Sequence, residues 1–262
     1  MLDNALLNYR IFGDLQHNTH APLVVLHGLL GSLENWYTFA RSQEGKRTVI
    51  AIDLRNHGNS PHVTGMTYRE MADDVVAVLD ALHITQCQLI GHSMGGKVAM
   101  TLALCYPALV ERLVVVDIAP KVYPPRHQAL IQSMVTMPLP ELQSRKQADE
   151  WLSNAVKQAF ERGFLLKNLG RRTDGTFYWQ CHLPEIARNY LKITSFPSLD
   201  STFNAPSLFI RGAQSDYVQD ADVDTIHRYF PYAQLQTIAT AGHLPHVQTP
   251  AEFTTLVEDF LA

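Results

Sequence analysis

Residues 89–100 read LIGHSMGGKVAM and place one serine between glycines, directly after a short apolar run. The stretch GHSMG at 91–95 fits the pattern G-x-S-x-G. At a strand-to-helix junction this pattern forms a tight turn that exposes the serine hydroxyl, and the close approach of strand and helix leaves room only for glycine. Ser93 would also lie at a helix N-terminus, where free N–H groups and the helix dipole stabilise negative charge. We therefore predict that Ser93 is a nucleophile.

Outward from Ser93, short apolar runs alternate with helical patterns. The stretch 67–84 opens on Thr67 with Glu70 three residues later, which is the capping-box pattern of a helix N-terminus. Several of the apolar runs are typical of parallel strands that are covered on both faces. The alternation predicts an α/β fold with a mostly parallel, doubly wound sheet. The expected strands are 21–28, 47–54, 87–93, 112–119, 205–212 and 235–242.

Residues 120–203 interrupt this alternation. They contain no convincing strand, and they carry helical patterns such as the one over 147–169. A segment of this length is too long to be a single connection between two strands. We expect it to be a helical cap over the carboxyl ends of the strands, where open α/β sheets bind their ligands. The chain then divides into a core of residues 1–119 and 204–262 and a cap of residues 120–203.

A serine hydroxyl needs a general base to act as a nucleophile at neutral pH. His243 follows the last expected strand in a Gly-His turn, the third place in the chain order serine, acid, histidine. We predict that His243 is this base, and that His246 and His57 pack or order loops nearby. An oxyanion hole would need two backbone N–H donors, which we assign to Leu29 and Met94.

Composition argues against several classes of partner. The 262 residues carry a net charge of −4, so no basic field attracts a nucleic acid. No stretch approaches the ~20 apolar residues of a membrane-spanning helix, and no histidines show the spacing of a metal site. The opening residues, 1–14, do not look like a secretory signal, and three widely spaced cysteines suggest reduced thiols. We expect a cytoplasmic protein without cofactor or metal, and the sequence leaves its oligomeric state open.

Five stretches in this chain resemble, in order, the landmarks of the α/β-hydrolase superfamily. The resemblance is to YbfF-type bacterial esterases and the related mitochondrial abhydrolase-11 proteins. It implies an α/β-hydrolase fold with the helical cap inserted after the sixth strand. It also implies a cofactor-free serine carboxylesterase for short- to medium-chain acyl esters, and for acyl-CoA thioesters. The stretches are HGLLGSLENW (27–36), DLRNHGNS (53–60), GHSMGGKVAM (91–100), VVVDIAP (114–120) and AGHLPHVQTP (241–250).

Two aspartates compete to be the acid that orients the histidine. In most relatives the acid lies three residues after a glycine, but here Gly212 is followed at that offset by Ser215, and Asp216 comes one position late. Asp117 ends an apolar run, where an ionisable group needs a buried partner such as the imidazole of His243. The YbfF-type proteins resemble the chain at this aspartate and use it to orient the histidine. We predict that Asp117 is the acid, with Asp216 as the alternative.

Arg126 and His127 lie just beyond the apolar run that ends at Asp117. We expect them to contact substrate, for example a phosphate of coenzyme A, and a solvated basic turn is the competing interpretation. The expected partner is a small-molecule ester or thioester. A cofactor-free haloperoxidase or a carbon–carbon bond hydrolase would use the same three residues. A hydrolase-like ligand receptor would retain them with slow turnover.

Overall fold

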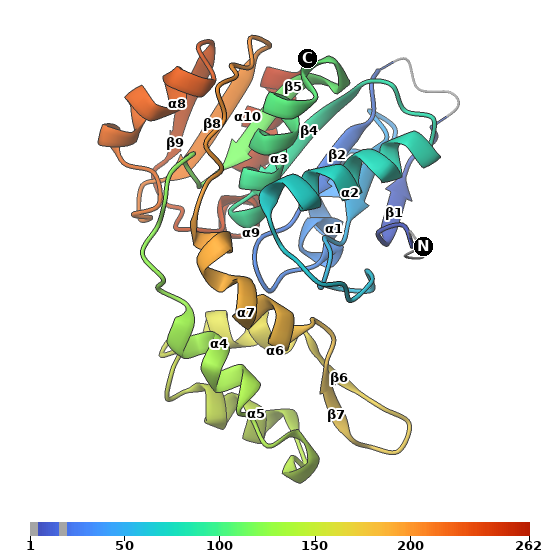
Figure 1. The fold of residues 1–262 in the computed structure, drawn as a ribbon, viewed down its shortest axis with the longest axis vertical. Helices are drawn as coiled ribbons and strands as arrows, with labels where there is room; N and C mark the ends of the chain where they lie inside the picture. The colour runs from blue at the N-terminus through green and yellow to red at the C-terminus, as the bar shows by residue number, and fades with distance from the viewer. Residues whose placement is uncertain (1–4, 16–19) are drawn as a thin grey trace.

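A mixed sheet forms the centre of the protein, which we describe from a computed structural model over residues 5–15 and 20–262 (Figure 1). Within these residues the sheet has seven strands in the order β1-β3-β2-β4-β5-β8-β9. The pair β1–β3 is antiparallel, and all the other pairs are parallel. The strands are β1 (Tyr9–Phe12), β2 (Leu23–Leu26), β3 (Val49–Ile52), β4 (Cys87–His92), β5 (Val110–Val116), β8 (Ser207–Gly212) and β9 (Ala233–Ile238).

Helices cover both faces of this sheet, because its central strands are apolar on both sides. Val24 and Leu26 of β2 pack in one cluster with α2 and α3, whereas Leu23 and Val25 pack in a second cluster with α1 and α10. The helix α2 begins after Thr67, whose side chain and Glu70 form the predicted capping box. The helices flanking the sheet are α1 (Tyr37–Ser42), α2 (Tyr68–Ala81), α3 (Met94–Cys105), α8 (Val223–Tyr229), α9 (Pro245–Gln248) and α10 (Pro250–Leu261).

The inserted segment, residues 120–203, runs between β5 and β8 and forms a separate layer at the lower end of the view in Figure 1. It contains α4 (Gln128–Val135), α5 (Arg145–Leu152), α6 (Ala159–Leu166), β6 (Leu169–Arg171), β7 (Phe177–Trp179) and α7 (Leu183–Thr194). The strands β6 and β7 pair with each other as an antiparallel hairpin and do not join the main sheet.

Three expectations about these elements were wrong, and one strand was missed. The segment follows β5, the fifth strand among the described residues and not the sixth, and the short edge strand β1 was not predicted. The segment also contains a hairpin, whose three-residue strands are too short to show a period of two. The helical pattern over 147–169 is split between α5 and α6, since sequence periodicity does not reveal where tertiary contacts bend a chain.

Strand register determines where the site lies. Leu26 of β2 pairs with Gly91 of β4, and His92 pairs with Val116 of β5. The residues that follow these three strands therefore meet at one edge of the sheet. That edge holds the turn after β2, the nucleophile candidate after β4 and Asp117 after β5.

The expectation about a secretory signal concerns in part residues 1–4, which lie outside the described residues. No helix in the described part of the chain is long and apolar enough to cross a membrane.

Candidate active site

Ser93 occupies the sharp turn between β4 and α3. Its backbone has φ 51° and ψ −116°, a region that side-chain-bearing residues rarely adopt, and it is the N-cap residue of α3. A β-carbon on Gly91 would overlap the carbonyl group of Gly95, and one on Gly95 would overlap the carbonyl oxygen of His27. Glycine is therefore required on both sides of the serine, as the sequence pattern predicts.

The structure brings Ser93, His243 and Asp117 together in one hydrogen-bonded row. The Nε2 atom of His243 lies 3.0 Å from the Oγ atom of Ser93, and its Nδ1 atom lies 2.7 Å from Oδ2 of Asp117. The imidazole stacks on the ring of Tyr217 with the centroids 3.8 Å apart. The backbone carbonyl of His243 accepts a hydrogen bond of 2.7 Å from Nε2 of His92. These contacts fix both the ring and the loop that carries it.

Asp117 is fully buried and has φ 51°. Its Oδ1 atom accepts a hydrogen bond of 3.0 Å from the N–H of Gly212, and its Oδ2 atom accepts from the hydroxyl of Ser215 as well as from His243. Ser215, three residues after Gly212, is therefore a hydrogen-bond donor to the carboxylate of Asp117. A carboxylate held by three donors keeps a single orientation toward the imidazole.

Asp216, the alternative acid, points elsewhere. Both of its carboxylate oxygens lie 2.6 Å from Nη1 of Arg126, and this hydrogen bond holds the pKa of Asp216 below its usual value. No hydrogen bond within the described residues joins Asp216 to His243. The geometry therefore favours Asp117 as the partner of the imidazole.

The turn after β2 lies against the nucleophile. A β-carbon on Gly28 would crowd the ring of His92 and the side chain of Ser93, so the backbone can come this close only with glycine there. The N–H of Leu29 forms no hydrogen bond within residues 5–15 and 20–262. Met94 is the first residue of α3, so its N–H has no acceptor inside the helix. Both residues line a cavity together with Ser93.

Buried neutral histidines surround this turn. Burial lowers the pKa of His27 to about 4 and the pKa of His57 to about 3. The Nε2 atom of His27 accepts the N–H of Leu54 at 3.0 Å. His246 stacks on Trp36 at 4.4 Å, and burial lowers its pKa to about 3. The expectations that His57 and His246 order loops or pack locally agree with these contacts.

Two cavities meet at Ser93, and residues of the inserted segment line both. Their volumes are about 210 Å³ and about 50 Å³. His127 borders both cavities, and Arg126 borders the smaller one. The backbone N–H of His127 donates to the hydroxyl of Tyr190 at 2.7 Å, and burial lowers the pKa of its ring to about 4. The larger cavity is lined by Gly28, Leu29, Leu30, His92, Ser93, His127, Leu130, Glu161, Phe164, Leu165, Tyr217, His243 and Leu244.

Sequence reasoning missed several residues of the site. Lys97 lies four residues after Ser93 and is buried, and its Nζ atom donates to the carbonyls of Thr194 and Ser195 at 3.0 and 2.6 Å. Burial lowers the pKa of Lys97 to about 7. Its place on the same face of α3 as the nucleophile, one turn away, was a signal that could have found it. Tyr217 follows Asp216 directly, but nothing in the sequence shows that its ring stacks on His243.

Among the residues that the structure describes, no group of three or more His, Cys, Asp or Glu side chains could hold a metal ion.

The chain is similar in sequence and in structure to known proteins. Residues 21–250 match the family described as alpha/beta hydrolase fold. The chain is 43% identical over 263 residues to a Danio rerio protein named sn-1-specific diacylglycerol lipase ABHD11, covering 97% of this chain and 82% of that one. It is 36% identical over 236 residues to Esterase YbfF of Escherichia coli strain K12, covering 90% of each. A solved structure titled Marine microorganism esterase superposes with a TM-score of 0.93 at 36% identity, covering 97% of this chain and 99% of that one.

The buried histidines make the stability of the fold depend on pH. Because the pKa values of His27, His57 and His246 lie below the unfolded value of 6.5, the unfolded chain binds more protons than the native one as pH falls below that value. The contribution of these three histidines to the unfolding free energy is fully present above pH 6.5. It is lost as pH falls from 6.5 to their pKa values in the folded protein, which are about 4 and 3. Each histidine should remove unfolding free energy at a rate that approaches about 1.4 kcal/mol per pH unit near pH 5. Urea unfolding from about pH 7 to about pH 5 measures this slope.

His246→Phe is the matched variant for this measurement. The Nδ1 atom of His246 is buried without a hydrogen-bond partner, so phenylalanine should keep the stacking on Trp36 at little cost. The slope near pH 5 should fall by about 1.4 kcal/mol per pH unit in the variant. An unchanged slope would contradict the assignment of His246 as a neutral buried group.

Proposed function

This chain belongs to the alpha/beta hydrolase fold family, and on that premise we propose that it is a serine carboxylesterase. Ser93 is the nucleophile, His243 is the general base and Asp117 orients the imidazole. The observation that carries the proposal is the continuous row from Oγ of Ser93 through both nitrogens of His243 to Asp117, with contacts of 3.0 and 2.7 Å. A nucleophile, a base and an orienting carboxylate in this arrangement suit acyl transfer.

The reaction follows from these contacts. His243 takes the proton of the Ser93 hydroxyl through Nε2 as the oxygen attacks the ester carbonyl carbon. The N–H groups of Leu29 and Met94 stabilise the negative charge on the tetrahedral oxygen. His243 then protonates the departing alcohol, and a water molecule that it activates hydrolyses the acyl-enzyme on Ser93. No cofactor takes part in this sequence of steps.

Residues 120–203 act as a cap over a core of residues 1–119 and 204–262. This part of the proposal is supported by the larger cavity, where Leu130 of α4 and Phe164 and Leu165 of α6 face the same space as Ser93 and His243. Such a cap limits the size of the substrate and keeps water away from the acyl-enzyme.

The substrates are short- to medium-chain acyl esters. The two cavities, of about 210 and 50 Å³, are smaller than the ~300–1,000 Å³ of pockets that enclose drug-sized ligands. The larger one is mainly lined by leucine, phenylalanine and tyrosine side chains, which favour an aliphatic group. The esterase and lipase names of the relatives support an ester substrate.

Acyl-CoA thioesters form a second substrate class, because a thioester presents the same carbonyl carbon to Ser93. Arg126 and His127 are the proposed contacts beyond the reacting bond. Arg126 is the cation that a coenzyme A phosphate would meet, but Asp216 already binds its guanidinium at 2.6 Å. An anionic substrate must therefore compete with a carboxylate, and the structure gives uncharged esters the stronger support.

A cytoplasmic location is part of the proposal and is supported by three unpaired cysteines, Cys87, Cys105 and Cys181.

Ser93→Ala tests the function directly. The variant should fold normally and lose at least about a thousandfold in kcat on p-nitrophenyl esters, since removing the nucleophile leaves only binding and the oxyanion hole. A fluorophosphonate probe should label the wild-type protein at Ser93 and leave the variant unlabelled. Labelling of a different serine, or near-native turnover by the variant, would refute the proposal.

Asp117→Asn and Asp216→Asn separate the two candidate acids. An amide at position 117 cannot stabilise the imidazolium and favours the wrong tautomer of His243, so kcat should fall about 10⁴-fold. Asp216→Asn breaks only the exposed pair with Arg126 and should change kcat less than about threefold. Steady-state kinetics on an uncharged ester measures both. A greater loss for Asp216→Asn would reverse the assignment.

A further inference from the structure

Leu30 follows the proposed oxyanion donor Leu29 and adopts an unusual backbone conformation. It has φ 58°, and its side chain is buried. A leucine in this left-handed region costs on the order of 1–2 kcal/mol, so neighbouring groups must hold it there. The structure shows what holds it. The N–H of Leu30 donates to Nε2 of His57 at 3.1 Å, and its carbonyl accepts from Nδ2 of Asn168 at 2.6 Å.

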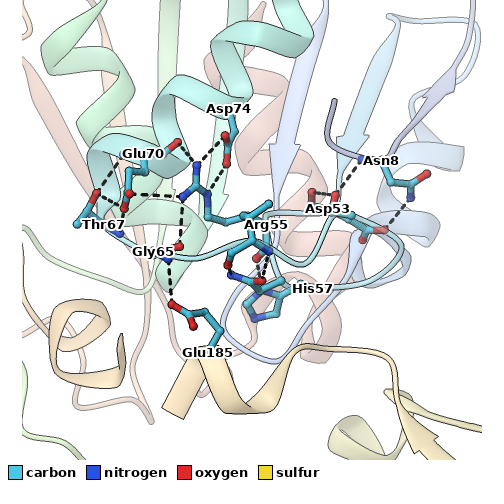
Figure 2. A network of polar contacts seen from close by, with 12 residues as sticks. Asn8, Asp53, Arg55, His57, Gly65, Thr67, Glu70, Asp74 and Glu185 are labelled. Carbon is cyan, nitrogen blue, oxygen red and sulfur yellow. Dashed lines mark hydrogen bonds and ion pairs between the residues drawn. The ribbon is translucent and has the colours of Figure 1, made fainter. Parts of the chain in front are cut away.

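The core provides His57. Its Nδ1 atom lies 2.9 Å from the carbonyl of Arg55, so Nδ1 carries the proton and Nε2 is free to accept. The pKa of about 3 keeps the ring neutral at physiological pH. Figure 2 shows that Arg55 itself is anchored, because its guanidinium binds both carboxylate oxygens of Asp74 at 2.5 and 2.8 Å. This half of the contact is made by residues of the core.

The inserted segment provides Asn168, directly before β6. Asn168 is 4% exposed, so its amide is out of water, and its backbone is fixed on both sides. Its N–H donates to the carbonyl of Leu165 in α6 at 3.0 Å, and its carbonyl accepts from the N–H of Gln180 after β7 at 2.8 Å. A side chain held by α6 and the hairpin therefore reaches the loop beside the nucleophile.

The same region of the segment binds the loop that carries His57. The N–H of His182 donates to the carbonyl of Asn56 at 2.8 Å. Figure 2 shows a second contact, in which the N–H of Gly65 donates to Oε1 of Glu185 at 2.9 Å. The inserted segment thus contacts Leu30 directly through Asn168 and indirectly through the loop of residues 53–65.

We propose that Asn168 is a positioning residue through which the inserted segment sets the oxyanion hole. The inference rests on the proposed function, because it assigns the N–H of Leu29 to the oxyanion. With the carbonyl of Leu30 held by Asn168 and its N–H held by His57, the backbone at Leu29 is fixed with its own N–H unpaired beside Ser93. Without Asn168, Leu30 can relax toward negative φ, which turns the peptide group between Leu29 and Leu30. That rotation shifts Leu29 and misaims the N–H of the preceding peptide group, which is this donor.

The test compares two variants of Asn168 with a matched control. Asn168→Leu keeps the approximate size of the side chain but has no group that can donate to the carbonyl of Leu30, and Asn168→Ala removes the group if the leucine variant fails to fold. The control is Gln180→Ala. Gln180 also joins the segment to the core, through a 2.7 Å hydrogen bond from Nε2 to Oδ1 of Asn59, but it does not touch the oxyanion loop with its side chain.

The kinetic readout distinguishes positioning from a general loosening of the segment. Loss of one oxyanion donor costs about 10²–10³ in kcat, so misaiming it should cost about 10-fold or more, with KM changed less than about twofold. Gln180→Ala should keep kcat within about twofold of the wild type. A rise in KM alone for the Asn168 variants, or an equal loss of kcat in Gln180→Ala, would overturn the proposal.

Amide hydrogen exchange over residues 28–31 tests the contact without any need for activity. The amide of Leu30 should exchange about 10-fold faster or more in the Asn168 variants and at the wild-type rate in Gln180→Ala. Unchanged exchange in the Asn168 variants would show that Asn168 does not hold this loop, whatever the enzyme does. The outcome is different if the wild-type protein shows neither esterase activity nor fluorophosphonate labelling. Faster exchange in the Asn168 variants would then still support the contact, and the proposed function would be refuted.

Discussion

The close approach of β4 and α3 is the constraint on which the candidate site depends. A β-carbon on Gly91 would overlap Gly95 of α3, and a β-carbon on Gly95 would overlap the carbonyl groups of Leu26 and His27 at the end of β2. The chain between β4 and α3 must therefore turn within one residue, and Ser93 takes the strained conformation that the turn requires. Because β2 and β5 flank β4 in register, the turn places Ser93 between the loops that carry Leu29 and Asp117. A wider turn would place Ser93 out of reach of both loops.

Backbone strain gathers around this turn. Five non-glycine residues have positive φ within the described part of the chain, and Ser93, Asp117 and Leu30 are three of them. Each is fixed by hydrogen bonds from segments distant in sequence. Asp117 is held by Gly212 and Ser215, and Leu30 by His57 and Asn168. A strained backbone conformation persists only where hydrogen bonds and packing from neighbouring residues hold it in place. Here the inserted segment provides some of these contacts.

Much of this arrangement could be predicted from the sequence, because its causes are local. Glycines on both sides of Ser93, a capping box at Thr67 and continuous apolar runs each follow from the chemistry of neighbouring residues. The choice between Asp117 and Asp216 was harder, since it depends on which way a side chain points from a loop. Ser215 stands at the offset from Gly212 where an acid is expected, and its hydroxyl donates to Asp117. The hairpin of the inserted segment and the reach of Asn168 depend on tertiary contacts that no periodicity reveals. The catalytic roles of all these residues stay predictions.

A crystal structure of the protein after reaction with a phosphonate ester tests the central claim most directly, since the adduct mimics the tetrahedral intermediate. The account predicts phosphorus bonded to Oγ of Ser93, with the phosphoryl oxygen about 2.7–3.1 Å from the backbone nitrogens of both Leu29 and Met94. Modification of another residue would contradict it. A phosphoryl oxygen on Ser93 that points away from those two nitrogens would contradict it as well.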